Sequence, residues 1–113
     1  MMIKGIGIDL INIERFETLK NKKEFLNQIL TKNELKICAA GKKKNRCYVL
    51  LFTVKEAIFK ACRIGLSFGS YWRDIEICNG LSISYTGRFR RIKKIHVSSG
   101  CSKRYALSFA IKE

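Results

Sequence analysis

Two charged side chains stand one helical turn apart in the segment FTVKEAIFKA, residues 52–61, whose other residues are mostly apolar. Glu56 and Lys60 have the spacing and order of a favourable ion pair on a helix surface. Phe52 and Phe59 project within about a third of a turn of Glu56, which indicates that this face is partly covered. The segment alone is therefore consistent with a surface salt bridge and with a functional carboxylate.

A second candidate carboxylate, Asp9, stands in the N-terminal segment GIGIDL. The apolar residues around it predict a short buried strand that ends near Asp9, after which Asn12 caps a helix. The residues expected to be buried in this strand are Ile3, Ile6, Ile8 and Leu10. On its own, Asp9 is consistent with a local role beside that helix. If Asp9 and Glu56 meet in space, the pair suits Mg²⁺. This ion is usually bound by one or two protein carboxylates together with phosphate oxygens of a substrate.

Other kinds of site are less well supported by the residues. GIGID resembles a glycine-rich phosphate loop but lacks the third glycine of GxGxxG, so Gly5 and Gly7 are expected to permit the close approach of another backbone. His96 is the sole histidine and is expected to be structural. The five cysteines include no CxxC pair, so a zinc site is not indicated and buried, reduced thiols are expected.

The elements that must position these residues predict an α+β fold in a single domain, residues 1–113. Helical spacing predicts helices over residues 13–20 and around residues 25–30. Thr31 and Glu34 have the T-x-x-E form of a capping box that opens a further helix, ending at Gly41.

The longest predicted helix runs from about residue 47 to residue 64, is closed by Gly65, and carries Glu56 and Lys60. Short, aromatic or β-branched segments follow it, and they predict a mostly antiparallel sheet packed on this helix. The last of them, residues 104–111, alternates large and small residues, which predicts a central strand with one face on the helices.

Lys and Arg number 23 against 9 Asp and Glu, a formal net charge of +14. Such a charge attracts polyanions: nucleic acid, anionic membrane, nucleotide or an acidic protein. The basic residues gather in KNKK (20–23), KKKNR (42–46) and RFRRIKK (88–94). Because Tyr85 and Phe89 accompany the last cluster, a small basic RNA-binding module is the alternative function.

The first residues, MMIKGIGIDLINIE, contain charges too early for a signal peptide. No apolar run approaches the length of a membrane span. A cytoplasmic protein is therefore expected.

The order and spacing of these segments resemble the bacterial holo-acyl-carrier-protein synthases, the small class of 4′-phosphopantetheinyl transferases. The resemblance spans nearly the whole chain. One specific part is G-x-G-x-D with an Arg six residues after the Asp, here Gly5, Gly7, Asp9 and Arg15. The other is x-K-E-A-x-x-K-A, which ends at Ala61.

The resemblance implies transfer of phosphopantetheine from coenzyme A to a serine of apo acyl carrier protein, with release of adenosine 3′,5′-bisphosphate, in fatty acid biosynthesis. Asp9 and Glu56 would ligate Mg²⁺ on the coenzyme A pyrophosphate. Lys60 would stabilise or protonate the leaving group. Either Glu56 or a metal-bound water is the candidate base. A homotrimer with sites between subunits is also implied, with no nucleic acid or membrane as partner.

The resemblance assigns the remaining site residues as well. The acidic recognition helix of the carrier protein would meet Arg15, Lys20, Lys22 and Lys23. The coenzyme A contacts would be Lys43, Lys44, Arg46, Lys60 and Ser102. Two positions depart from the family pattern: Leu51, where many members have Arg, and Cys101, where a second His is common. Because the metal positions and Arg15 are intact, an active enzyme is expected, with a catalytically impaired relative as the alternative.

Overall fold

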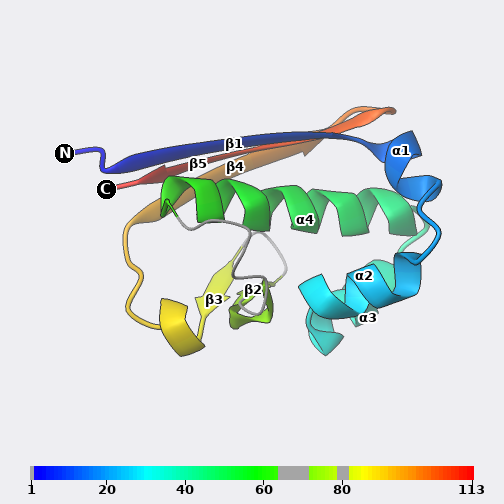
Figure 1. The fold of residues 1–113 in the computed structure, drawn as a ribbon, viewed down its shortest axis with the longest axis horizontal. Coiled ribbons are helices and arrows are strands. Elements are labelled where there is room, and N and C mark those ends of the chain that lie inside the picture. Colours follow the sequence, from blue (N-terminus) through cyan, green and yellow to red (C-terminus); the bar gives the residue numbers. More distant parts are fainter. Residues whose placement is uncertain (1, 64–71, 79–81) are drawn as a thin grey trace.

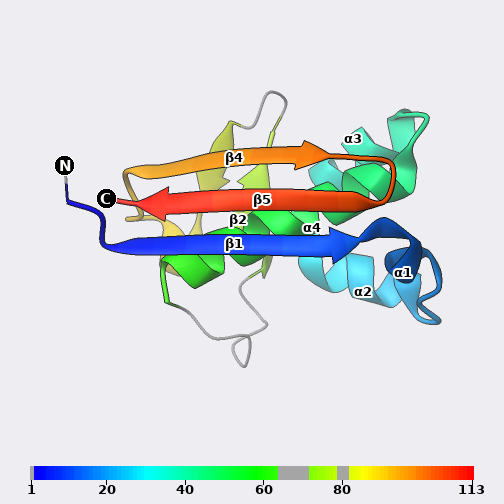
Figure 2. The ribbon, with the colours of Figure 1, turned by 90° about the horizontal axis from the view of Figure 1, so that it is seen from above.

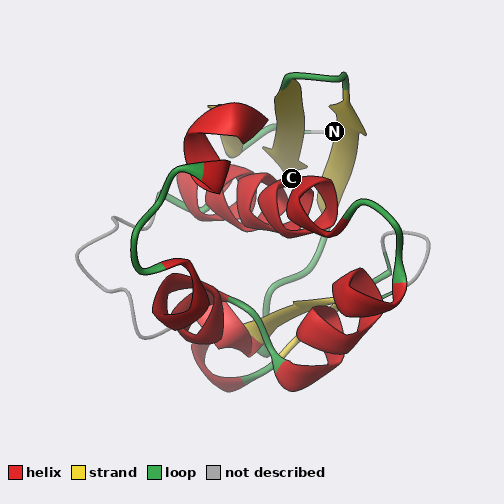
Figure 3. Ribbon diagram, turned by 90° about the vertical axis from the view of Figure 1, so that its right-hand side faces the viewer, coloured by secondary structure: helices red, strands yellow, loops and turns green. Residues whose placement is uncertain are grey.

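The computed structural model describes residues 2–63, 72–78 and 82–113. The structure has a three-stranded sheet and a separate pair of strands. Figures 1 and 3 show the larger sheet on one side of a long helix and the strand pair, with most of the shorter helices, on the other; the first helix lies beyond the end of the sheet (Figure 1). The α+β class predicted from the sequence is confirmed. The elements in chain order are β1 (Gly5–Asn12), α1 (Ile13–Glu17), α2 (Lys22–Ile29), α3 (Lys32–Ala40), α4 (Lys44–Ala61), β2 (Ile75–Ile77), β3 (Ile83–Tyr85), the 3₁₀ helix η3 (Gly87–Phe89), β4 (Ile95–Cys101) and β5 (Tyr105–Lys112).

The three-stranded sheet has the order β1-β5-β4, and both neighbours pair antiparallel with β5. Figure 2 shows β5 between the other two strands, with α4 running beneath them. The predicted central position of the C-terminal strand is therefore confirmed. β2 and β3 pair with each other in a separate antiparallel sheet, so the predicted strands divide between two sheets.

The strand β1 lies so close to α4 that no side chain fits between the two backbones. A Cβ atom at Gly5 would lie 1.8 Å from the carbonyl oxygen of Ala61, and one at Gly7 would lie 1.9 Å from that of Ala57. The glycines therefore permit a close backbone approach, as expected. The next residue on the same face of β1 is Asp9, whose side chain is only 14% exposed.

The prediction that the large residues of β1 are buried is wrong for this chain. Ile3, which precedes the strand, is 49% exposed, and Ile6, Ile8 and Leu10 are 53%, 52% and 59% exposed. Because the glycines occupy the positions that face α4, strand alternation places the branched residues on the opposite face. The strand also continues to Asn12, beyond its predicted end near Asp9.

The central strand β5 follows the same rule. Its small residues Ala106, Ser108 and Ala110 are buried, whereas Tyr105 and Leu107 are exposed. The side of the sheet away from α4 is thus apolar and uncovered in this chain. We call it the open sheet face, formed by Ile6, Ile8, Leu10, Tyr105 and Leu107.

The helix ends follow the predicted caps. The Asn12 side chain accepts hydrogen bonds from the backbone N–H groups of Glu14 and Arg15, at 2.9 and 3.4 Å. Thr31 and Glu34 form the complete capping box of α3. α1 ends after five residues, short of the predicted residue 20.

The long helix α4 begins one turn before the predicted start, so it takes in part of the basic segment 42–46. It ends at Ala61 with Cys62 as its cap, before the predicted end. Residues 64 and 65, which the prediction placed at that end, lie outside the described residues. So do residues 67–71, the first part of the short segment predicted as a strand over residues 67–77, of which β2 is the last part. Among the described helices, none combines the length and the apolar character needed to cross a membrane.

A disulfide joins Cys38 of α3 to Cys47 of α4, whose Cα atoms are 5.4 Å apart. The expectation of reduced thiols is wrong for these two residues, because the turn after α3 brings the start of α4 back alongside it. The expected burial is confirmed for Cys38, which is 1% exposed. Of the free cysteines that are described, Cys62 is partly buried and Cys78 and Cys101 are exposed.

The contact between β1 and α4 leads to a prediction for Gly7→Ala. The added methyl group must displace one of the two backbones, so we expect the free energy of unfolding to fall by at least about 2 kcal/mol. Gly100→Ala in β4 is the matched control, because a Cβ there meets nothing within 4 Å. Urea unfolding followed by circular dichroism measures both, and an equal effect of the two substitutions would contradict the close approach.

Candidate active site

The face of β1 that meets α4 brings Asp9 against two charged residues of the helix. The Lys60 amine donates hydrogen bonds to Asp9 Oδ1 at 3.1 Å and to the carbonyl oxygen of Ile8 at 3.0 Å. Within the described residues, the ion pair that Lys60 forms is with Asp9 rather than with Glu56. The surface salt bridge between Glu56 and Lys60 that the spacing allows is therefore not formed; Lys60 pairs with Asp9 instead.

The two carboxylates are incompletely balanced by positive charge. Asp9 Oδ2 is buried and has no hydrogen-bond partner among the described residues. Glu56 is only 6% exposed. Burial raises the pKa of the Glu56 carboxyl, the nearby Asp9 carboxylate raises it further, and Lys60 opposes these effects in part. Like charges are thus held together in a poorly solvated place, which is unfavourable unless a cation joins them.

The donor set of this carboxylate pair suits a hard divalent cation. Mg²⁺ is usually bound by one or two carboxylates, with water and substrate phosphates completing its shell. The described part of the chain contains no group of three or more His, Cys, Asp and Glu side chains arranged to hold a metal. Asp9 and Glu56 would supply two carboxylate ligands, which fits an ion that is shared with a phosphate ligand.

Three of the predicted coenzyme A contacts, Lys43, Lys44 and Arg46, gather elsewhere, in a pocket of about 410 Å³ at the start of α4. We call it the basic pocket; its lining is Ile13, Glu17, Lys42, Lys43, Lys44, Asn45, Arg46 and Lys103. Lys103, from the turn between β4 and β5, was missed by the sequence analysis, and the run Ser-Lys-Arg in that turn was the available signal. Arg46 precedes Glu56 by ten residues, or about 15 Å of helix, so this pocket and the carboxylates lie well apart in one chain.

The two departures from the family pattern occupy different environments. Leu51 is buried in the core, at 9% exposure, where an apolar residue is well accommodated. Cys101 ends β4 close to the basic pocket. The residue is exposed at the surface, but desolvation of its thiol raises the thiol pKa, and nearby Arg46 opposes that shift.

Ser102 takes part in the turn that follows Cys101. Its hydroxyl accepts hydrogen bonds from the backbone N–H groups of Tyr105 and Arg104, at 3.0 and 3.3 Å. The described contacts of Ser102 are thus with the turn itself.

The residues expected to meet a carrier protein surround α1 and the start of α2. Arg15 lines a mostly apolar groove of about 270 Å³, together with Phe16 and Leu19. Lys20 and Lys23 are exposed. The Lys22 amine lies 5.5 Å from the ring centre of Phe16. This surface combines positive charge with an apolar groove, which suits an amphipathic, acidic partner.

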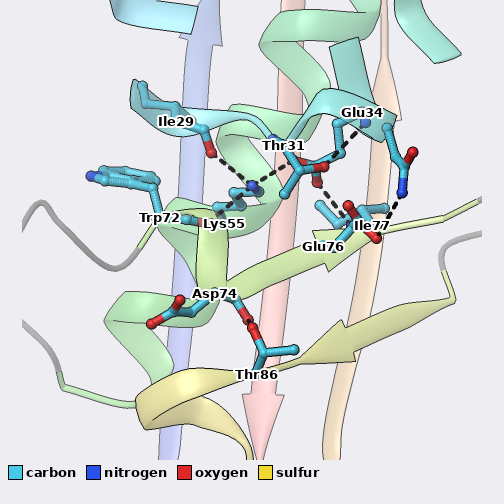
Figure 4. A network of polar contacts seen from close by, with 10 residues as sticks. Ile29, Thr31, Glu34, Lys55, Trp72, Asp74, Glu76, Ile77 and Thr86 are labelled. Carbon is cyan, nitrogen blue, oxygen red and sulfur yellow. Dashed lines mark hydrogen bonds and ion pairs between the residues drawn. The ribbon is translucent and has the colours of Figure 1, made fainter. Parts of the chain in front are cut away.

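Sequence analysis missed the role of Lys55, the motif residue next to Glu56. Its side chain and that of Glu34 are completely buried, and they form an ion pair of 2.7 Å (Figure 4). Burial lowers the pKa of Lys55, and the Glu34 carboxylate opposes that shift. The sequence could have indicated this burial, because Phe52 and Phe59 lie three residues before and four residues after Lys55, on the same face of the helix.

The fold is that of a small α+β protein in which a strand and a long helix bring Asp9, Glu56 and Lys60 together. The family model described as the 4′-phosphopantetheinyl transferase superfamily matches residues 5–110. The holo-[acyl-carrier-protein] synthase of Limosilactobacillus reuteri is 37% identical over 99% of this chain and 98% of its own length. The chain belongs to this superfamily and, within it, to the holo-[acyl-carrier-protein] synthases.

Two further relatives agree with this assignment. The synthase of Geobacter sulfurreducens is 38% identical over 80 residues, which make up 69% of this chain and 64% of that protein. A crystal structure of the Bacillus anthracis synthase in complex with CoA (3′,5′-ADP) is 29% identical and superposes with a TM-score of 0.81, covering 99% of this chain and 97% of that one.

The raised pKa of Glu56 predicts how stability depends on pH in the absence of divalent cations. The Glu56 carboxyl has a higher pKa in the folded protein than in the unfolded chain, where its pKa is about 4.5. The folded protein therefore holds this proton more tightly. Ionisation of Glu56 therefore lowers the free energy of unfolding as the pH rises above that value. We expect Glu56→Gln in EDTA to be more stable than the wild type at pH 7, with a difference that vanishes towards pH 4.5.

Urea unfolding across this pH range measures the effect. The matched control is Glu24→Gln, which removes an exposed carboxylate of α2 and should leave the pH dependence of the wild type unchanged. A Glu56→Gln protein that is less stable than the wild type at pH 7 would contradict the conclusion that burial and the nearby Asp9 carboxylate destabilise the ionised Glu56.

Proposed function

We propose that the protein is a magnesium-dependent holo-[acyl-carrier-protein] synthase that transfers 4′-phosphopantetheine from coenzyme A to a serine of apo acyl carrier protein. The observation that carries this proposal is the approach of Asp9, whose Oδ2 is buried, to the buried Glu56, with Lys60 beside them, in a chain of this family. The Bacillus anthracis synthase, whose structure is a complex with CoA (3′,5′-ADP), supports the proposed co-substrate.

In the proposed reaction the serine oxygen forms a bond to the phosphorus that carries pantetheine. The bond between that phosphorus and the bridging oxygen of the pyrophosphate breaks, and adenosine 3′,5′-bisphosphate leaves with the electron pair. The serine proton passes to a base. Mg²⁺, when bound, would neutralise charge on the pyrophosphate.

The residues of this chain have distinct parts in the proposal. Asp9 and Glu56 would hold the cation at the junction of β1 and α4. Lys60 is half exposed, at 49%, so its amine can reach a ligand while it stays near Asp9. It would stabilise the leaving phosphate by charge and by donating a hydrogen bond or a proton.

The basic pocket would hold other phosphate groups of coenzyme A through Lys43, Lys44 and Arg46. The distance between this pocket and the carboxylates, about 15 Å along α4, suits either an extended ligand or two halves of a site from different subunits. We propose a homotrimer with sites between subunits. The open sheet face supports association, because exposed apolar patches of this kind commonly mark interfaces.

We also propose that the chain is one domain and acts in the cytoplasm. The Cys38–Cys47 disulfide counts against that location, because such bonds are rare in reducing compartments.

The transfer reaction is the direct test of the proposed function. Incubation with apo acyl carrier protein, coenzyme A and Mg²⁺ should add phosphopantetheine to the carrier, as measured by mass spectrometry. Asp9→Asn and Glu56→Gln should each reduce the rate by at least about a hundredfold, because each removes a metal ligand while the shape of the side chain is kept. Wild-type protein that gives no adduct at any concentration would contradict the proposal.

Arg15→Ala tests the carrier-protein surface separately. We expect the KM for the carrier protein to rise about tenfold, with the KM for coenzyme A unchanged, since the charge at the groove steers and holds an acidic helix. Lys36→Ala is the matched control: it removes one exposed charge from α3, away from the groove. An equal effect of the two substitutions would show that only the net charge matters.

A further inference from the structure

A buried polar network joins four segments of the chain to α4 at the level of the active site. The Lys55 amine donates to Glu34 Oε1 at 2.7 Å, to the carbonyl oxygen of Ile29 at 2.8 Å and to that of Trp72 at 3.0 Å. All three ammonium protons therefore have acceptors. Figure 4 shows these contacts converging on Lys55 from the end of α2, the start of α3 and the segment before β2.

The Glu34 carboxylate is equally well satisfied. Oε1 accepts a hydrogen bond from the Thr31 N–H at 2.8 Å, which is half of the α3 capping box. Oε2 accepts one from the Ile77 N–H of β2, also at 2.8 Å. One carboxylate thus fixes the start of α3, the strand β2 and the helix α4 relative to one another.

Stability alone is a weak explanation for such a pair. Moving two charges out of water is unfavourable, and apolar replacements of buried ion pairs are often as stable or more stable. Unlike an apolar contact, the pair is directional. Its hydrogen bonds form at only one rotation of α4 about its axis and one position of α4 along that axis. A buried pair of this kind is best explained by what it positions.

The residue that immediately follows Lys55 is Glu56. On the opposite side, α4 is held against the sheet by the close approach of Gly7 and by a buried hydrogen bond of 2.8 Å between Thr53 and Ser108. The carboxylates of Glu56 and Asp9 repel each other until a cation binds, so their approach depends on a helix that cannot turn away. Contacts on both sides of α4 prevent that rotation.

We propose that Lys55, through its buried ion pair with Glu34, is a positioning residue that sets α4 so that Glu56 faces Asp9 across the cation site. Lys55 is enclosed by protein and acts through Glu56. This inference rests on the proposed function. It adds a role for the motif lysine and for the capping-box glutamate, which lie on the far side of α4 from β1.

The test compares Lys55→Met with the double variant Lys55→Met/Glu34→Gln. The single variant leaves Glu34 as an uncompensated buried carboxylate, so its urea midpoint should fall. The double variant removes that charge, so its midpoint should recover. Both variants lack the ion pair between Lys55 and Glu34. Both should therefore bind Mn²⁺ about tenfold more weakly than the wild type in the presence of coenzyme A, as measured by electron paramagnetic resonance.

Steady-state transfer supplies a second readout. In both variants we expect a lower kcat and a higher Mg²⁺ requirement, with the KM for coenzyme A unchanged. Leu30→Ala is the control for instability, because Leu30 is 1% exposed in the core and its side chain carries no polar atom. It should lower the urea midpoint and leave Mn²⁺ affinity within twofold of the wild type, a bound of about 0.4 kcal/mol.

Three results would overturn the inference: Mn²⁺ affinity that recovers together with stability in the double variant, wild-type affinity in Lys55→Met, or an equal loss of affinity in Leu30→Ala. Each would show that Lys55 acts only through global stability. Failure of the proposed function is distinguishable, because the wild type itself would then neither bind Mn²⁺ with coenzyme A nor transfer. In that case the inference fails with the function on which it rests.

Discussion

The close approach of β1 to α4 is the constraint on which the rest of the structure depends. Gly5 and Gly7 leave no room for a side chain between strand and helix. Asp9, the next residue on that face, is thereby carried to the side of Glu56 and Lys60. The same approach turns the large residues of β1 outward, so the geometry of the site and the apolar open sheet face have one cause.

Charge is distributed unevenly over this frame. The net charge of +14 is concentrated on exposed segments, notably the basic pocket and the surface around α1. The carboxylate pair lies between strand and helix, where burial and mutual repulsion raise the pKa of Glu56. A cation that binds there would relieve this repulsion, so the site holds an unfavourable interaction that a metal and its phosphate ligand can remove.

Much of the fold could be predicted because local signals were strong. Asn12, Thr31 and Glu34 act as caps through short-range hydrogen bonds that their sequence spacing specifies. The central strand followed from alternation. Asp9 and Glu56 are 47 positions apart, so local patterns could not predict that the two residues meet. The family resemblance was needed to favour that arrangement.

Tertiary contacts decided what local patterns could not. The pattern of β1 predicts a buried isoleucine face, but glycines occupy the helix-facing side because only they fit there. The ion pair of Lys60 with Asp9, the disulfide of Cys38 with Cys47, and the burial of Lys55 all depend on partners that are remote in sequence or brought together by a turn. Spacing within one helix therefore predicts a plausible partner for Lys60, and the fold supplies a different one.

We propose that β1 and α4 together form one divalent-cation site. The most direct test of this claim is a crystal structure of the protein with Mn²⁺ and coenzyme A, in which anomalous scattering locates the metal. We predict a peak bonded to one carboxylate oxygen of Asp9 and one of Glu56, with a pyrophosphate oxygen in the same shell. A peak bonded to neither carboxylate, with coenzyme A present, would contradict the claim.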